Sequence, residues 1–447
     1  MHSLARVVGR RAAVRVAALR TASTKTDNSQ ENSGSSSSSV VASTKMESVL
    51  NFDIPIEKRS LSRGLALNKF EKDFMIFPEY TDSDDLRNIE GFVDVFKETL
   101  TRAVNERAQE KAGELSAETL SALQMSSIPG CFIPKEFGGV GMTYKDIMRI
   151  NEELSLDWAV SAHSTASHMA TTLLLLYGTD EQKEKYLPLI ASGKCRPSIA
   201  FPTAPGSLSE TCEVHGNTPS GVSGTLLASG VRALESTKAN LLFVFAHVTD
   251  ANKDKQLHCF IIDRPSLREG EKWETTRDET LGLRAIDVGR LSLSVNVTDA
   301  NMLDGDGKEI ASEALSSSRL PFAAAAIGYG KRVLEDVSRV ANVSASSITP
   351  GHSLSAHPHM HRLVAQLSLQ LYALESAVYY LAGLLDERLP IVVDVENALL
   401  HRMTRTFLRQ CTMALLEVLG TRAIDSQELY EKRIRDVSTL MAIVRLL

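Results

Sequence analysis

The chain of 447 residues is predicted to be mostly α-helical, with one β domain in its middle. Two patterns predict this class. Apolar residues recur at helical spacing before residue 198 and after residue 305, whereas short β-rich runs alternate with Gly, Pro, Ser and Asn between them. The composition, 43% hydrophobic and 23% charged, is typical of globular proteins, and the net charge of −6 gives no basic footprint for nucleic acid.

The first 65 residues differ from the rest. Residues 1–25 carry six basic residues among small and apolar ones and no acidic residue, which is typical of a mitochondrial transit peptide. The alternative is a disordered basic tail. Residues 26–65 are mostly rich in Ser and Asn, and we expect a disordered linker there. No apolar run reaches the roughly 20 residues that a membrane-spanning helix needs.

Residues 66–197 are predicted to form an N-terminal helical domain. An apolar stripe begins after Ser83, which can cap the helix, and further helices are expected over 143–156, 160–177 and 179–192. Thr179 is followed three residues later by Gln182, which is a capping-box arrangement, and Pro188 is expected to kink or break that helix. The stripe consists of Leu86, Ile89, Val93, Phe96, Leu100 and Val104.

Residues 198–305 are predicted to form the middle β domain, with strands over 241–248, 257–262 and 291–297. Residues 306–447 are predicted to be helical again. The expected helices there are 308–342, 357–387, 394–418 and 427–446. The five cysteines are scattered, so they indicate reduced structural thiols. The histidines between residues 352 and 361 fit a loop or helix start better than a metal site, and no metal is expected.

Three segments resemble the acyl-CoA dehydrogenase family: FIPKEFGGVGMT (132–143), GTDEQKEKYLPLIASG (178–193) and LGLR (281–284). The similarity runs from about residue 70 to the C-terminus. It is greatest to the very-long-chain branch, and within that branch to a member that is an assembly factor of respiratory complex I. The resemblance implies an N-terminal helical domain, a β-barrel-like middle domain and a C-terminal four-helix bundle. It also implies a homodimer or higher homo-oligomer.

Proteins of this family bind FAD and remove a proton and a hydride from an acyl-CoA. The resemblance places Thr203 and Ser209 in the first flavin segment. The sequence around them fits an ordinary Pro/Gly turn equally well. In the second segment Leu234 stands where the family has an aromatic residue that packs on the flavin, and Ser236 matches the hydroxyl residue. In a later glycine-rich turn Gly420 matches, whereas Thr421 replaces a glycine.

Two other family elements are absent from the aligned positions. Ser344 stands where the family has an arginine that grips the cofactor pyrophosphate, and a serine cannot make that bidentate contact. The catalytic glutamate aligns with Val444, and the alternative position for this base aligns with Ser318. Arg319, next to it, matches a family arginine and is the substrate-binding candidate. Residues 437–447 contain no Asp or Glu at all.

These positions predict a mitochondrial protein, in the matrix or on the matrix face of the inner membrane, that kept the fold and lost the dehydrogenase chemistry. Its role would be a scaffold for respiratory complex assembly proteins. The alternative is an active FAD-dependent dehydrogenase of long or very long acyl chains in fatty acid β-oxidation, which passes electrons to electron-transfer flavoprotein. An acyl-CoA binder without redox chemistry is a third possibility.

Overall fold

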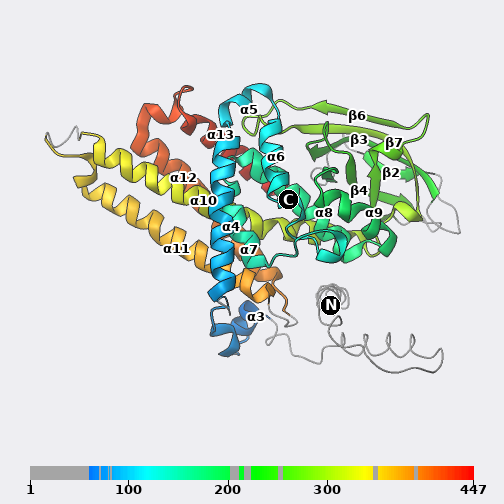
Figure 1. Cartoon of the computed structure of the whole chain (residues 1–447), viewed down its shortest axis with the longest axis horizontal. Helices are drawn as coiled ribbons and strands as arrows, with labels where there is room; N and C mark the ends of the chain where they lie inside the picture. The colour runs from blue at the N-terminus through cyan, green and yellow to red at the C-terminus, as the bar shows by residue number, and fades with distance from the viewer. Residues whose placement is uncertain are drawn as a thin grey trace.

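The computed structural model describes residues 60–69, 72–78, 80, 83–201, 211–215, 223–249, 255–345, 351–386 and 391–446. The predicted transit peptide, Thr203 and Ser209 lie outside these residues. Long C-terminal helices gather on one side of the molecule, and a β-sheet forms the other side (Figure 1). Helices α8 and α9 lie against the sheet (Figure 1) and share a buried apolar cluster with strands β4 and β5.

The N-terminal domain is helical, as predicted. Its α-helices are α3 (Leu61–Ala66), α4 (Ser83–Ala103), α5 (Glu106–Ala112), α6 (Ala117–Met125), α7 (Tyr144–Leu154), α8 (Trp158–Tyr177) and α9 (Asp180–Ala191). Helix α3 occupies the end of the segment that we expected to be linker, because Ser60 caps it and Glu396 of a distant helix accepts hydrogen bonds from Ser60 and Ser62. Tertiary contacts therefore order a short helix that its own sequence does not predict.

The start of α9 confirms the capping box. The Thr179 hydroxyl accepts a hydrogen bond from the Gln182 backbone N–H, and the Gln182 side chain accepts one from the Thr179 backbone N–H. Pro188 does not break this helix, which continues to Ala191. A proline removes only one intrahelical hydrogen bond, and the burial of Leu187 and Ile190 around it keeps the last turn in place.

The described part of the middle domain forms one seven-stranded sheet. Its strands are β1 (Pro197–Phe201), β2 (Thr211–His215), β3 (Ser223–Leu234), β4 (Leu241–Thr249), β5 (Lys255–Asp263), β6 (Lys272–Arg277) and β7 (Val288–Thr298). Strand β1 pairs with both β3 and β4, and β2 also pairs with both, so these four strands close into a ring. Strand β5 extends the sheet from β4, while β7 and then β6 extend it from β3. This closure agrees with the predicted barrel-like domain.

The C-terminal domain consists of α10 (Gly307–Val343), α11 (Pro358–Asp386), α12 (Asp394–Leu419) and α13 (Leu429–Leu446). Helices α10, α11 and α12 pack on one another, and α7 packs on α10 and α11. Two glycines of α10 permit close approach. A Cβ atom at Gly328 would lie 2.0 Å from the carbonyl oxygen of Glu152, and one at Gly330 would lie 2.3 Å from the Phe407 ring. Both glycines therefore serve helix packing.

Helix α13 is fixed to the other domains by buried polar contacts. The Lys432 ammonium lies 3.0 Å from a carboxylate oxygen of Asp157, at the start of α8, and 2.8 Å from one of Asp436. Asp436 also accepts a hydrogen bond of 2.6 Å from the backbone N–H of Leu283. Helix α13 therefore packs on the LGLR motif, residues 281–284. A side chain at Gly282 would collide with the Arg435 backbone, at 2.4 Å.

The five cysteines are all free, and within the described residues no cluster of His, Cys, Asp or Glu is arranged to hold a metal. In the part of the chain that the structure describes, no helix combines the length and hydropathy needed to cross a membrane.

Candidate functional site

The structure places the described candidate residues in two separate regions. Ser236 lies in the turn between β3 and β4 of the middle domain, whereas Gly420 follows α12 in the C-terminal domain. Gly420 has a φ of 55° and is exposed. Ser318 and Arg319 lie on α10. One chain therefore does not bring all of these residues into a single cofactor site.

The hydroxyl of Ser236 is used inside the protein. Ser236 is fully buried, and its Oγ donates a hydrogen bond of 3.0 Å to Oδ2 of Asp287. The same oxygen accepts a hydrogen bond of 2.9 Å from the backbone N–H of Thr237. Gly289 lies close by, since a Cβ there would be 2.0 Å from the Ser236 Oγ. The hydroxyl that matches the family's second flavin segment thus holds the turn closed.

Glu235, in the same turn, makes a buried ion pair with His163 of α8. Its carboxylate lies 2.6 Å from Nδ1 of the imidazole, and both side chains are almost inaccessible, at 7% and 12%. Burial opposes ionisation, but the His163 charge and hydrogen bond hold the pKa of Glu235 below its usual value. Glu235 adopts a φ of +52°, which strains a residue with a side chain. Hence the turn joins the β domain to α8.

Neither position of the catalytic base offers a proton acceptor of the required kind. Ser318 is buried, and its hydroxyl donates to the carbonyl of Leu315 in its own helix, at 2.8 Å. Val444 lies in α13, and a valine has no acid–base chemistry. Glu313 is the buried carboxylate nearest along α10, more than one turn before Ser318.

Arg319, the substrate-binding candidate, is half-buried on α10. Within the described residues it makes no ion pair, and burial lowers the pKa of its guanidinium from the ordinary value. Across the helix interface lies His401 of α12, whose ring is 6.3 Å from that of Phe322. The arginine is therefore a cation without a counterion in the part of the chain that the structure describes.

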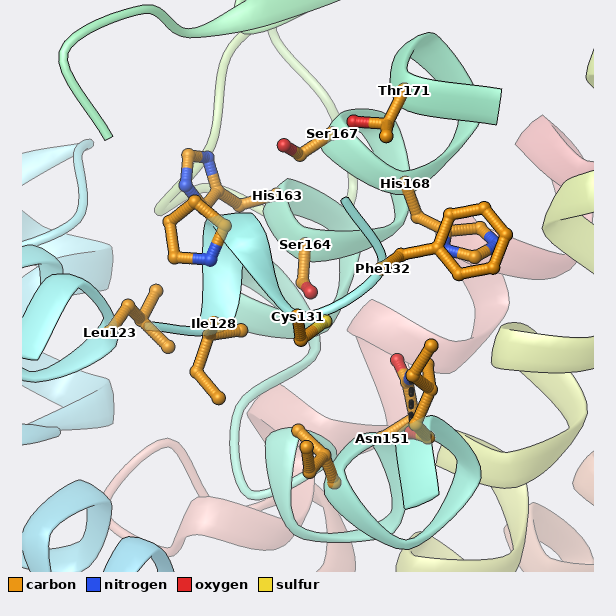
Figure 2. Close-up of a pocket in the computed structure, with 13 residues that line it drawn as sticks. Leu123, Ile128, Cys131, Phe132, Asn151, His163, Ser164, Ser167, His168 and Thr171 are labelled. Carbon is orange, nitrogen blue, oxygen red and sulfur yellow. Dashed lines mark hydrogen bonds between the residues drawn. The ribbon is translucent and has the colours of Figure 1, made fainter. Parts of the chain in front are cut away.

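A small cavity, lined by both polar and apolar side chains, lies along α8. Its volume is about 30 Å³, and a second space of about 20 Å³ adjoins it at His163 and Ser167. Figure 2 shows His163, Ser164, Ser167 and Thr171 facing this cavity from α8, with Asn151 on the opposite side. Typical ligand pockets measure roughly 300 Å³ or more. The cavity has room for about two water molecules, and not for an acyl chain.

Two titratable groups that line the cavity, His168 and Cys131, are uncharged at pH 7. Burial lowers the pKa of His168 to about 4, so its imidazole is neutral at pH 7, and its ring lies over Phe132 at 4.7 Å (Figure 2). Burial raises the pKa of Cys131 to about 12, so this thiol does not ionise. Asn151 Oδ1 and Thr171 Oγ1 have no hydrogen-bond partner in the described protein, and water would satisfy them.

Sequence reasoning missed both the Glu235–His163 pair and the cavity. The available signal was the spacing of polar residues on α8: His163, Ser164, Ser167, His168 and Thr171 share one face of an otherwise buried helix. The pairing with Glu235 joins residues 72 positions apart, and only the fold reveals it.

The described residues do not fit FAD. In the second flavin segment, Leu234 replaces the aromatic residue of the family. The Ser236 hydroxyl and the Thr237 N–H donate hydrogen bonds to Asp287, and Glu235, which lies between Leu234 and Ser236, is paired with His163. A flavin there would require new partners for these buried groups, which costs about 1–3 kcal/mol for each one left unsatisfied. Accordingly, no step of a flavin reaction is assigned to this site.

Comparison with known proteins matches both helical domains. The acyl-CoA dehydrogenase N-terminal domain matches residues 87–194, and the acyl-CoA dehydrogenase C-terminal domain matches residues 305–443. The very long-chain specific acyl-CoA dehydrogenase of Rattus norvegicus is 25% identical over 353 residues, which is 74% of this chain and 52% of the relative. A probable acyl-CoA dehydrogenase of Bacillus subtilis is 28% identical over 323 residues, covering 70% and 49%. The chain spans about half the length of these curated relatives.

Solved structures show the same fold. Butyryl-CoA dehydrogenase of Megasphaera elsdenii superimposes with a TM-score of 0.69 at 20% identity, covering 82% of this chain and 95% of that one. An acyl-CoA dehydrogenase of Bacillus anthracis, in complex with FAD, gives a TM-score of 0.68 at 20% identity, covering 85% and 68%. With both helical domains matched and the three-domain architecture shared, this chain belongs to the acyl-CoA dehydrogenase family.

Proposed function

We propose that this protein kept the acyl-CoA dehydrogenase fold without the flavin chemistry and acts as a scaffold in the assembly of a respiratory complex. One observation carries the first half of the proposal. The turn expected to meet the flavin is closed by the Glu235–His163 pair and by the hydrogen bonds of Ser236 and Thr237 to Asp287. The base positions Val444 and Ser318 agree with it, since neither residue abstracts a proton.

The scaffold role rests on the resemblance to a complex I assembly factor and on the loss of catalytic groups, and the mitochondrial location rests on residues 1–25. A fluorescent fusion of the whole chain should enter mitochondria, and deletion of residues 1–25 should leave it in the cytosol. Entry of the deleted form would contradict the targeting proposal. Assembly proteins of the respiratory complex should be recovered by crosslinking within mitochondria.

A homo-oligomer through the C-terminal domain is also proposed. Helices α11 and α12 expose large apolar side chains, namely Leu369, Tyr372, Leu399, Met403 and Met413. The last three are spaced along one side of α12, and apolar stripes of this kind mark protein interfaces. Light scattering should give at least a dimer mass. Substitution of Leu399 and Met403 by Glu should reduce the mass to that of a monomer, and an unchanged mass would contradict this interface.

The alternative is an active dehydrogenase of long or very long acyl-CoA, with FAD as cofactor and electron-transfer flavoprotein as acceptor. It is favoured by the names of the relatives alone. Purified protein supplied with FAD, long-chain acyl-CoA and an artificial electron acceptor tests it. The scaffold proposal expects no reduction of the acceptor.

A Val444→Glu variant sharpens that test, because it returns a carboxylate to the aligned base position. If the flavin position is also lost, the variant should stay inactive. Activity in the variant would mean that the flavin site is competent and that only the base is missing. Activity of the unmodified protein would establish the alternative function.

A further inference from the structure

Helices α10 and α12 bring a set of polar side chains together across their interface. On α12, Asn397, His401 and Arg405 recur every four residues and so share one face of the helix. On α10, Ser316 and Arg319 share a face for the same reason. These two helices are packed together, and the faces meet: the side-chain amide of Asn397 donates to the Ser316 hydroxyl at 3.3 Å.

The set contains two arginines. No Asp or Glu occurs in residues 314–334 of α10, 397–416 of α12 or 437–446 of α13, and the nearest acid along α10 is the buried Glu313, just before the first of these stretches. The acids at the start of α12 are engaged elsewhere, since Asp394 pairs with Arg63 and Glu396 accepts hydrogen bonds from Ser60 and Ser62. Arg319 of α10 and Arg405 of α12 therefore lie at the interface of the two helices, and none of these three stretches supplies an acid that would neutralise them.

Several donors of the set are available. A guanidinium has five N–H donors, and Arg405 uses one of them for a long contact of 3.4 Å to the Met441 carbonyl of α13. Nδ1 of His401 is buried and has no partner within the described residues. Half-buried cations and an unpaired imidazole form a site for a ligand that supplies acceptors and negative charge.

We propose that Arg319, His401 and Arg405 form a binding site for a tetrahedral oxyanion, that is, a phosphate or sulfate group. Three donors that approach from two helices suit a tetrahedral group, which presents more acceptor oxygens than a carboxylate. Guanidinium groups bind such groups through paired hydrogen bonds. This site is separate from the cavity along α8 and does not depend on the absence of flavin chemistry.

The imidazole gives the site a signature of its own. Burial, followed by the charges of Arg319 and Arg405, lowers the pKa of His401 to about 4, so His401 is neutral near pH 7. A bound anion would offset those charges and raise the pKa of His401 toward neutrality. Anion binding near pH 6 should therefore take up protons, and the affinity should rise as the pH falls from 7 to 5.

Calorimetric titration of the full protein with sulfate at low ionic strength tests the proposal, because sulfate itself does not titrate in this pH range. The wild type should bind about one equivalent. Arg319→Gln should weaken binding by about tenfold or more, the loss expected for a charged hydrogen bond, and Arg319→Lys should weaken it less. Arg409→Gln removes an exposed arginine of α12, the helix that carries His401 and Arg405, and should change affinity by less than about twofold.

His401→Gln should abolish the proton uptake, which is measured by repeating the titration in two buffers of different ionisation enthalpy. Circular dichroism identifies any variant that fails to fold. If Arg319→Gln does not fold, the conservative Arg319→Lys variant takes its place in the comparison. Three results would overturn the proposal: no saturable sulfate heat, an equal loss in Arg319→Gln and Arg409→Gln, or undiminished proton uptake in His401→Gln. Equal losses would show only general attraction of anions to a basic helix.

Discussion

Replacement of Lys432 by Met should strongly destabilise the protein. Lys432 lies between the carboxylates of Asp157 and Asp436, at 3.0 and 2.8 Å, and these carboxylates are buried to 0% and 1% exposure. Methionine fills a similar volume but leaves both carboxylates without their cation. Removal of one partner from a buried ion pair typically costs about 3–5 kcal/mol of unfolding free energy. We expect a loss in that range at pH 7.

The pH dependence of the loss follows from the carboxylates. Burial raises the pKa of Asp436 even though Lys432 opposes the rise, so the pKa of Asp436 increases further in Lys432→Met. A carboxylate whose folded pKa is raised destabilises the fold at pH values above that pKa, and protonation relieves the cost as the pH falls. The deficit of the variant should therefore be larger at pH 7 than at pH 5.

Urea denaturation followed by circular dichroism measures both effects. Lys97→Met is the matched control, because the Lys97–Glu153 pair is exposed and should be worth less than about 1 kcal/mol. Adding Asp436→Asn to Lys432→Met should recover part of the loss, since the amide oxygen can still accept from Leu283 without a buried charge. A loss under 1 kcal/mol that does not change with pH would refute this reasoning.

Three further outcomes are expected. Gly328→Ala should destabilise the protein by about 1–3 kcal/mol, because the added carbon would lie 2.0 Å from a backbone oxygen, whereas Gly91→Ala, with open space, should stabilise it by roughly 0.5–1 kcal/mol; urea denaturation measures both, and equal effects would contradict the packing argument. Glu235→Gln should lower stability above about pH 4.3, and its difference from wild type should shrink as the pH falls from there through the lowered pKa of Glu235; a difference that does not shrink on acidification would count against the ion pair. Burial raises the pKa of every cysteine thiol, so a thiol reagent should react with the folded protein far more slowly than with the urea-unfolded protein, and rapid reaction before unfolding would contradict their burial.

Helix and strand positions could be predicted where a long apolar period or a strong cap marks them. Helices 308–342, 357–387 and 394–418 were predicted within a residue or so of their observed bounds, and Thr179 was identified as a cap. Helices α5 and α6 and strands β1, β2, β3 and β6 were not predicted. These elements are short, or weakly apolar along one face, and the sheet or neighbouring helices stabilise them.

The candidate site could be predicted only as a set of family positions. The alignment matched Ser236 to the second flavin segment and Ser318 to a position for the base, but it could not show that both hydroxyls are bonded within the protein. Glu235 lies between the aligned positions Leu234 and Ser236, and its partner His163 lies in the N-terminal domain. Long-range pairs of this kind depend on the packing of α8 against β1, which no local pattern encodes.

The central claim is that the fold survives while the flavin position is closed, and the visible absorption spectrum of residues 46–447 tests it most directly. The purified protein would be incubated with FAD, separated from free cofactor and checked for folding by circular dichroism. We predict a folded, oligomeric protein with no flavin absorption bands. Stoichiometric flavin bands in the separated protein would contradict the claim.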